Sequence, residues 1–292
     1  MKSTTILSVL SSALLTSALP VPQYDAPAPT SSYGIAYDLM ADDGSCRSST
    51  QIASDVASMA AQGYKQIRTY DVGCDVGALA AAISQNPGLS LFAGINGISN
   101  VQSDLSKLIN YLSAHWDVVH TVNIGNEVVN SGAGSASAVA SAVAAGRSQL
   151  AAAGYSGNVV TVDTFVAMIA NPVLCEVSDY CAANAHAFFD GNVDASGAGE
   201  FVHRMQGQVS QAAGGKRTVI TESGWPSCGA GNGAAQTGTS QQQAAVSSLK
   251  AAFQSTPEDL FLFQSYNAVY KHSGANAAEQ CWGIMGGGQG GW

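Results

Sequence analysis

Residues 218–227 read Thr-Val-Ile-Thr-Glu-Ser-Gly-Trp-Pro-Ser. The first four of these residues are β-branched, which favours a strand. Gly224 and Pro226 end the strand, and Glu222 lies at its exit. Burying an ionised carboxylate is costly unless the group is paired or used in chemistry. A strand that ends in a glutamate therefore indicates a functional site.

A second stretch has the same design. Residues 118–127 read Val-Val-His-Thr-Val-Asn-Ile-Gly-Asn-Glu, a β-rich run that ends in Asn126 and Glu127. Two strands that each deliver a glutamate at the carboxyl end predict a pair of carboxylates facing one pocket. Cleavage of a glycosidic bond uses such a pair.

Short β-rich runs alternate with helical stretches from Tyr33 onward. The candidate strands are Gly34–Tyr37, Gln66–Tyr70, Ser90–Ile95, Val119–Ile124, Val159–Asp163, Ala182–Ala187, Val219–Thr221 and Leu260–Ser265. The candidate helices between them are Ser49–Gln62, Val76–Gln85, Ser103–Trp116, Ser135–Ala153, Asn171–Val177, Ala198–Ala212 and Thr239–Ser255. We expect Ser103 to open one helix and Gly154 to follow the end of another.

This alternation implies βαβ units with parallel strand pairing. Eight units in roughly 250 residues match a (β/α)8 barrel, so we predict an α/β fold, a TIM barrel, in a single domain over residues 33–292. The alternative is an open doubly wound sheet. Against it, the first strand is not followed by Gly-x-Gly-x-x-Gly, and the Gly-rich residues 231–238 come in a loop after the seventh strand.

The start of the 292-residue chain has the pattern of an exported protein. Residues 1–18 combine Lys2, a short apolar run and small residues before a cleavage point, as secretory signals do. The apolar run is too short to span a bilayer, so we expect no membrane partner. Residues 19–32 contain four prolines and are predicted to form a stiff, extended leader.

The composition excludes some partners. The chain has 11 Lys and Arg against 20 Asp and Glu, and a net charge of −9. Nucleic-acid binding needs clustered cations, so we expect no nucleic-acid partner. Only 11% of the residues are charged, which is compatible with a neutral, hydroxyl-rich ligand. We also expect a monomer.

The six cysteines are an even number in an exported chain, as expected for disulfides. Six cysteines allow about 15 pairings, and the sequence alone does not choose among them. Our preferred set is Cys46–Cys74, Cys175–Cys181 and Cys228–Cys281. Because the chain contains no Cys-x2-Cys pair, a zinc site is not indicated.

In a (β/α)8 barrel, side chains at the carboxyl ends of the strands line the active site. This rule selects polar and aromatic residues after each of several strands. They are Tyr37, Asp38, Arg68, Tyr70, Asp71, Asn126, Glu127, Asp163, Thr164, Asn184, His186, Phe189, Glu222, Trp225, Asn267 and Lys271, with Trp282 further on.

Several of these stretches resemble a known family. The stretch around Glu222 resembles the signature of glycoside hydrolase family 17, and Ile-Gly-Asn-Glu127 resembles the Asn-Glu motif of the wider clan of retaining barrel glycosidases. Residues 119–132, 159–165 and 184–192 are similar to the fungal branch of soluble cell-wall glucanases and glucanosyltransferases. The likeness extends over about Gly34 to Gly283.

The resemblance implies a role for each glutamate: Glu222 as nucleophile and Glu127 as acid/base. A retaining glycosidase needs these two roles, because its nucleophile must stay ionised while its acid holds a proton. Arg68 would keep Glu222 ionised if it reaches that group, and Asn126 would donate to the sugar 2-hydroxyl. Tyr70, Phe189, Trp225 and Trp282 offer flat faces for sugar rings. The remaining predicted substrate-binding residues are Tyr37, Asp163, Asn184, His186, Asn267 and Lys271. No metal or organic cofactor is implied.

Structural roles compete with these assignments. Arg68 could pair with Asp71 instead, and His186 could be a hydrogen-bonded core residue. Trp225 and Trp282 could be core packing, because large aromatic residues dominate cores. Asp163 could cap the following turn.

The favoured function is a secreted, extracellular or cell-wall enzyme that acts on β-1,3-glucan through a covalent intermediate. Either water or a second glucan chain could resolve that intermediate, and the sequence leaves both outcomes open. One alternative is a glucan-binding wall protein without turnover. Another is a related barrel glycosidase that acts on a different β-glucan or on mannan. Carboxylate catalysis in an acidic protein predicts an acidic working range.

Overall fold

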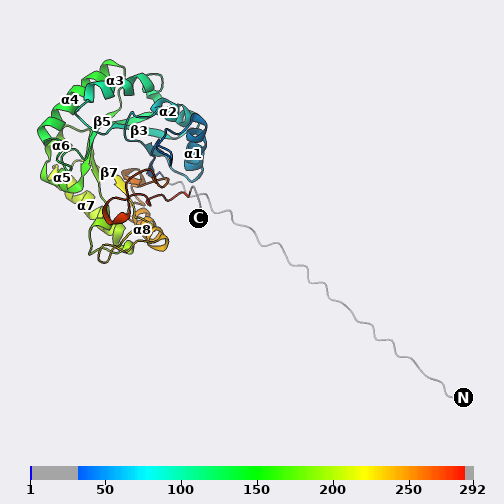
Figure 1. The fold of residues 1–292 in the computed structure, drawn as a ribbon. Helices are drawn as coiled ribbons and strands as arrows, with labels where there is room; N and C mark the ends of the chain where they lie inside the picture. The colour runs from blue at the N-terminus through cyan, green and yellow to red at the C-terminus, as the bar shows by residue number, and fades with distance from the viewer. Residues whose placement is uncertain (2–31, 287–292) are drawn as a thin grey trace. The chain divides into compact units, whose positions relative to one another are not determined.

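The computed structural model describes Met1 and residues 32–286, so residues 2–31 and 287–292 lie outside the account that follows. The predicted signal and nearly all of the predicted leader fall outside the described residues. Residues 32–286 form one compact unit, shown as a coloured ribbon in Figure 1.

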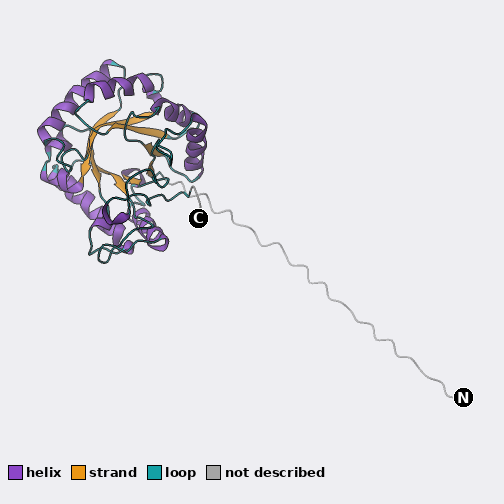
Figure 2. Ribbon diagram, in the orientation of Figure 1, coloured by secondary structure: helices purple, strands orange, loops and turns teal. Residues whose placement is uncertain are grey.

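Eight parallel strands close into a barrel in chain order, and β8 pairs with β1. Figure 2 shows the ring of strands inside a ring of helices. The predicted (β/α)8 barrel is confirmed, and the open-sheet alternative is wrong. The strands are β1 Gly34–Ala36, β2 Gln66–Arg68, β3 Ser90–Ile95, β4 Val119–Asn126, β5 Asn158–Thr164, β6 Cys181–Asn184, β7 Thr218–Ser223 and β8 Leu260–Leu262.

The helices pack outside this ring, and several 3-10 turns lie in the loops. The α-helices are α1 Ser49–Ala61, α2 Val76–Ser84, α3 Val101–Leu112, α4 Ala136–Ala152, α5 Phe165–Ala170, α6 Val173–Glu176, α7 Ala198–Ala212 and α8 Thr239–Ala252. The 3-10 turns are η1 Trp116–Val118, η2 Ala187–Phe189, η3 Ala195–Gly197, η4 Pro257–Asp259 and η5 Ala275–Ala277.

Some predicted boundaries were wrong. The helix predicted at Asn171–Val177 is α6 alone, and the extra helix α5 precedes it. Helix α3 begins at Val101 rather than at Ser103, and Trp116 belongs to η1. Gly154 does follow α4, with a φ of 86° that glycine adopts without strain.

Four strands are shorter than predicted. β1 stops at Ala36 rather than at Tyr37, and β2 stops at Arg68 rather than at Tyr70. β6 stops at Asn184, because the chain turns into η2, and β8 stops at Leu262. The early end of β6 places His186 in the connection that follows the strand rather than within it. That connection lies at the carboxyl end of the barrel.

The barrel interior is filled by side chains. Phe92 on β3 and Phe261 on β8 meet edge to face at 5.5 Å. Those two strands are not neighbours in the sheet, so the contact must cross the inside of the barrel. Gly34 makes room for this contact, because a Cβ there would lie 2.3 Å from the Phe261 ring. An apolar plug therefore supports the polar layer at the carboxyl ends of the strands.

Disulfides tie the connections together. The structure contains Cys46–Cys74, Cys175–Cys181 and Cys228–Cys281, as preferred from the sequence. A disulfide stabilises mainly by restricting the unfolded chain, and more so for longer loops. Cys228–Cys281, with 53 residues of separation, anchors the long segment after β8. Among the described residues, no helix combines the length and hydropathy needed to cross a bilayer.

Candidate active site

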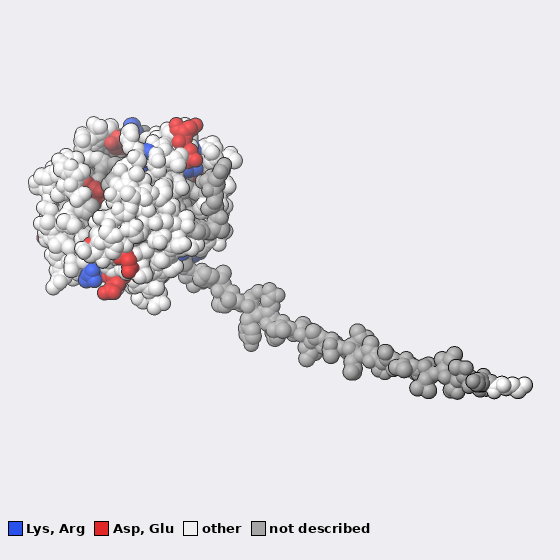
Figure 3. Space-filling view, turned by 60° about the horizontal axis from the view of Figure 1, so that its bottom comes forward, with Lys and Arg blue, Asp and Glu red and all other residues white. Residues whose placement is uncertain are grey.

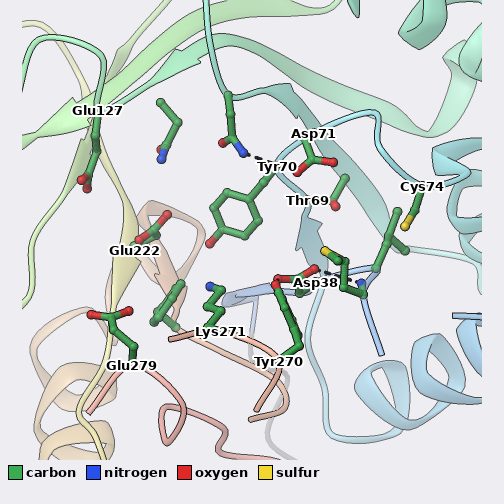
Figure 4. Close-up of a pocket in the computed structure, with 15 residues that line it drawn as sticks. Asp38, Thr69, Tyr70, Asp71, Cys74, Glu127, Glu222, Tyr270, Lys271 and Glu279 are labelled. Carbon is green, nitrogen blue, oxygen red and sulfur yellow. Dashed lines mark hydrogen bonds between the residues drawn. The ribbon is translucent and has the colours of Figure 1, made fainter. Parts of the chain in front are cut away.

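The two predicted glutamates line one cavity at the carboxyl ends of the strands. Its volume is about 330 Å³, and Glu127 and Glu222 both belong to its wall. Figure 4 shows the carboxyl groups of Glu127 and Glu222 on the same side of this cavity. The Tyr70 ring lies nearer the middle of the view, on the way to the opposite side. The cavity walls also include Asp38, Met40, Thr69, Asp71, Cys74, Asn96, Asn126, Phe263, Tyr270, Lys271 and Glu279. We call this the active-site cavity.

Glu222 is held by a buried cation. It is 6% exposed, and Arg68, which is fully buried, donates from Nη1 to its Oε1 at 2.8 Å. Nε2 of His186 lies 3.2 Å from Oε2 of Glu222. Burial alone would raise the pKa of Glu222, but the charge of Arg68 and the contact with His186 outweigh it, and the pKa is lowered. Glu222 therefore keeps its negative charge to lower pH than a free glutamate does.

Glu127 has a different setting. Its Oε1 accepts a hydrogen bond of 2.8 Å from Nδ2 of Asn184, a neutral group. Burial first, and then the negative charge of Glu222, raise the pKa of Glu127, while the bond from Asn184 lowers it in part. The net direction is upward, so Glu127 holds a proton to higher pH than a free glutamate does.

The backbone at Glu127 is in the left-handed region, with a φ of 54°. A non-glycine residue there costs about 1–3 kcal/mol and persists only where its surroundings impose it. The Glu127 amide donates to the Val162 carbonyl at 2.9 Å, and Ser131 donates from backbone and hydroxyl to the Glu127 carbonyl. Asp163 accepts from the amides of Val129 and Asn130, at 2.9 and 3.3 Å. These bonds fix the turn that presents the carboxyl group.

A buried polar network joins the two sides. Arg68 donates from Nη2 to Oδ1 of Asn126 at 2.8 Å and from Nη1 to Oδ1 of Asn184 at 3.3 Å. Thr221 also donates to that Asn184 oxygen, at 2.8 Å. Asn184 thus contacts both Arg68, the partner of Glu222, and Glu127 itself. Side chains from β2, β4, β6 and β7 fix one another at this point.

Arg68 pairs with Glu222, which decides against the alternative pairing with Asp71. Arg68 also lies over the Tyr70 ring at 4.6 Å. The Tyr70 hydroxyl faces Glu222 in Figure 4, and burial followed by the Glu222 charge raises its pKa well above the usual value. Tyr70 therefore remains a neutral phenol beside the charged carboxylate.

The structure brings Tyr70, Asn126 and Lys271 to the active-site cavity, and Arg68, Asn184 and His186 to its carboxylates. Phe189 is 48% exposed, and its ring lies 6.1 Å from that of His186. These predicted residues therefore form one constellation at the mouth of the barrel.

Other predicted residues lie elsewhere. Tyr37 is fully buried and donates to Asp55 at 2.8 Å, pointing to α1. Trp225 and Trp282 are 0% and 1% exposed, so they are packed in the core and offer no free face to a sugar ring. Asp163 fixes the turn after Glu127, as described above, and Asn267 accepts from the Gly283 amide at 2.8 Å.

Sequence reasoning missed some cavity residues. Asn96 directly follows β3, so the strand-end rule could have selected it. Phe263 directly follows β8, and the same rule could have selected it as well. Tyr270 and Glu279 come from the long segment after β8, whose path no sequence pattern predicts.

A (β/α)8 barrel with two acidic residues of opposite pKa shift at the ends of β4 and β7 is the design of a glycosidase. Comparison with known proteins agrees with that class. The chain belongs to the BtgE/BtgC glycoside hydrolase domain family, whose model matches residues 34–283.

The relatives extend the comparison. The cell surface mannoprotein MP65 of Candida albicans is 44% identical over 255 residues, which are 86% of this chain and 66% of that protein. The probable family 17 glucosidase SCW10 of Saccharomyces cerevisiae is 40% identical over 257 residues, which are 86% and 64% of the two chains. The resemblance to family 17 is thus confirmed. This chain spans 64–66% of the length of these relatives.

Solved structures share the fold. An active-site mutant of a β-1,3-glucanosyltransferase from Rhizomucor miehei, in complex with laminaritriose, matches with a TM-score of 0.75 at 22% identity. The match covers 87% of this chain and 93% of that one. An endo-laminarinase from Formosa matches with a TM-score of 0.72 at 15% identity, over 91% and 86% of the two chains.

Proposed function

We propose that this protein cleaves β-1,3-glucan with retention of the anomeric configuration, through a covalent glycosyl intermediate on Glu222. The observation that carries the proposal is the opposite direction of the two pKa shifts in one cavity. The names of the relatives and of the solved structures, which include a β-1,3-glucanosyltransferase and an endo-laminarinase, support the substrate class.

In the first step, a Glu222 oxygen attacks the anomeric carbon and the glycosidic C–O bond breaks. The proton of Glu127 moves to the departing oxygen. Arg68 holds Glu222 in its charged form before the attack, at 2.8 Å. Tyr70 and Asn126 line the same cavity. The Tyr70 hydroxyl and the Asn126 amide can donate hydrogen bonds to oxygen atoms of the bound sugar.

The second step needs Glu127 as a base. Once Glu222 is esterified, it no longer carries the negative charge that raises the pKa of Glu127. The Glu127 pKa then falls, which favours the carboxylate at the moment when a proton must be taken from the incoming hydroxyl. That hydroxyl attacks the anomeric carbon and releases Glu222. The loss of the Glu222 charge thus changes Glu127 from an acid in the first step to a base in the second.

The incoming hydroxyl belongs to water or to a second glucan chain. We include chain transfer in the proposal because the Rhizomucor miehei protein of similar fold is named a glucanosyltransferase. Export by the predicted signal and residence at the cell wall belong to the same proposal, since a relative is named a cell surface mannoprotein. Amino-terminal sequencing of the exported protein checks the predicted cleavage after Ala18.

The deciding experiment is mass spectrometry of the products from a defined β-1,3-linked oligosaccharide, with NMR of the newly formed anomer. We expect the β-anomer first, and products longer than the substrate if transfer competes with water. The control is Glu222→Gln, which keeps the size of the side chain. A wild-type protein that binds the oligosaccharide but yields no product at any pH would favour the non-catalytic alternative.

A further inference from the structure

Strand β4 carries one extra residue just before the proposed acid. Asn123 pairs with Val160 of β5. The next pair along the two strands joins Asn126 to Val162, so two residues of β4 lie opposite one residue of β5. Such an extra residue is a β-bulge, which bends a strand and re-aims the side chains beyond it. Gly125, inside this bulge, has a φ of 85°, which glycine adopts without strain.

The bulge decides which side chains of β4 face the inside of the barrel. Val160 and Val162 belong to the apolar cluster that fills the barrel interior. Their partners Asn123 and Asn126 therefore share that inner face, although side chains three positions apart lie on opposite faces of a regular strand. A shift of one residue moves every following side chain to the other face. Without the bulge, the Asn126 side chain would face the helices instead of Arg68.

Two buried side chains converge on the main chain of the bulge. The Gly125 carbonyl accepts from Nδ2 of Asn123 and from Oγ1 of Thr161, each at 3.3 Å. Asn123 and Thr161 are 0% and 1% exposed. Asn123 also donates to the Ile95 carbonyl of β3, at 3.4 Å. The bulge is thereby tied to both neighbouring strands.

The space around the bulge is closely filled. At Gly94 on β3, a Cβ would lie 2.1 Å from Oδ1 of Asn123, so glycine leaves the room that this amide occupies. At Gly125, a Cβ would lie 3.1 Å from a methyl group of Val128. Packing and the two hydrogen bonds therefore act on the Gly125 carbonyl together.

We propose that Asn123 and Thr161 are positioning residues for the reaction: by holding the Gly125 carbonyl, they set the place from which Glu127 gives its proton. The proposal rests on the function proposed above. Among the described residues, the walls of the active-site cavity do not include either side chain, so both act on the substrate through Glu127. The Glu127 carboxyl group must lie within hydrogen-bond reach of the departing oxygen. A misplacement of about 1 Å can cost about a hundredfold in rate.

The test removes a hydroxyl group and keeps the shape of the side chain. Thr161→Val removes one donor to the Gly125 carbonyl, and Thr161→Ser keeps a hydroxyl there. The matched control is Thr121→Val, at a fully buried threonine in the first half of β4 whose hydroxyl lies 2.9 Å from that of Tyr180. This control costs stability without loosening the bulge. Both threonines are buried, so the sparsely charged surface in Figure 3 stays the same.

The measured quantity is the ratio of kcat/KM on a β-1,3-linked oligosaccharide to kcat/KM on a dinitrophenyl glycoside, whose leaving group departs without a proton. A displaced acid slows only the oligosaccharide, so Thr161→Val should lower this ratio about tenfold to a hundredfold. Thr161→Ser should restore most of the ratio, and Thr121→Val should leave it unchanged. An unaltered ratio in a folded Thr161→Val protein overturns the positioning role and leaves the proposed function intact.

Asn123→Leu tests the other donor, because leucine has a similar size and no amide. It should lower the same ratio, since the Gly125 carbonyl again loses one of its two partners. Urea titration shows how far each variant is destabilised, and a loss of folded protein alone lowers the rates on both substrates equally. An unchanged ratio in a folded Asn123→Leu protein overturns the part assigned to Asn123.

Hydrogen exchange reports on the bulge without any substrate. The amides of Asn126 and Glu127 donate to main-chain carbonyls at 2.8 and 2.9 Å. Both amides should exchange faster in Thr161→Val than in Thr121→Val, because local opening exposes them. Equal protection in the two variants contradicts the positioning role. A wild-type protein that converts neither substrate would instead overturn the proposed function, and the positioning role with it.

Discussion

The ends of β4 and β7 deliver the same type of residue into the same cavity and give it opposite character. Glu222 lies within β7, beside a shift in strand register, and meets Arg68 and His186. Glu127 follows its strand in a left-handed turn and meets the neutral Asn184. Burial raises the pKa of both, and at Glu222 the charge of Arg68, together with the contact with His186, reverses that direction. The partner, rather than the carboxyl group itself, therefore decides which glutamate is charged.

Glu222→Gln tests the contrast between the two glutamates most severely. It removes the proposed nucleophile while keeping shape, so kcat should fall on the order of 10⁴-fold or more, as when other catalytic nucleophiles are removed. Steady-state kinetics on laminari-oligosaccharides measures the loss. Circular dichroism of the variant provides the control, because Arg68 loses its partner. Activity within tenfold of wild type would exclude Glu222 as the nucleophile.

Glu127→Ala should show a loss that depends on the leaving group. On a glucan substrate we expect about 10²–10⁴-fold lower kcat/KM, the usual contribution of general acid catalysis. A dinitrophenyl glycoside needs no protonation on departure, so formation of the intermediate from it should be nearly unaffected. The burst of dinitrophenol in stopped flow measures this step. Equal losses on both substrates would argue against Glu127 as the acid.

The positions of Glu127 and Glu222 were predictable from the sequence for a physical reason. Parallel strands in a closed barrel bring all their carboxyl ends to one face, so residues far apart in the chain meet there. The rule also selected Arg68, Asn126 and Asn184, which form the network around the pair. Their exact partners depend on side-chain reach, which strand position alone does not give.

The wrong and the missed site residues have the same cause: strand position does not give the direction or reach of a side chain. Trp225 and Trp282 were predicted to stack on sugar rings, but both side chains are buried. The residue type does not distinguish the two roles, because an aromatic side chain packs in a core as readily as against a ligand. Tyr37 lies one residue past β1 and turns toward α1 rather than into the barrel. Tyr270 and Glu279 reach the cavity through an irregular segment fixed by the Cys228–Cys281 disulfide. An irregular segment has no hydrophobic periodicity, so the sequence does not predict its path.

Removal of the Arg68 cation tests whether its charge sets the pKa of Glu222. Arg68→Met should raise the pKa of Glu222, so the acid limb of the pH–activity profile moves to higher pH, whereas Arg68→Lys should retain part of the charge effect. Breaking a buried ion pair costs about 3–5 kcal/mol of stability. A depressed carboxyl pKa stabilises above the unfolded-state pKa, and this contribution is lost as pH falls through the folded-state pKa. The difference in stability between wild type and Arg68→Met should therefore be largest near neutral pH and shrink on acidification.

Urea titrations at several pH values measure this dependence for wild type and for both variants. A stability difference that stays constant from neutral to acidic pH would mean that the charge of Arg68 does not act through Glu222.

The smallest predicted effect concerns Asn184, which lowers the pKa of Glu127 through its hydrogen bond. Asn184→Ala removes that bond, so the pKa of Glu127 should rise and the alkaline limb of kcat/KM should move to higher pH. Asn184→Asp adds a negative charge at the same place and should move it further. The order wild type, Ala, Asp is the expected order of alkaline limbs, measured by pH profiles of kcat/KM. Asn184 also accepts a hydrogen bond from Arg68, the partner of Glu222. A shift of the acid limb alone would therefore show that Asn184 acts mainly on the pKa of Glu222, and would contradict its predicted effect on Glu127.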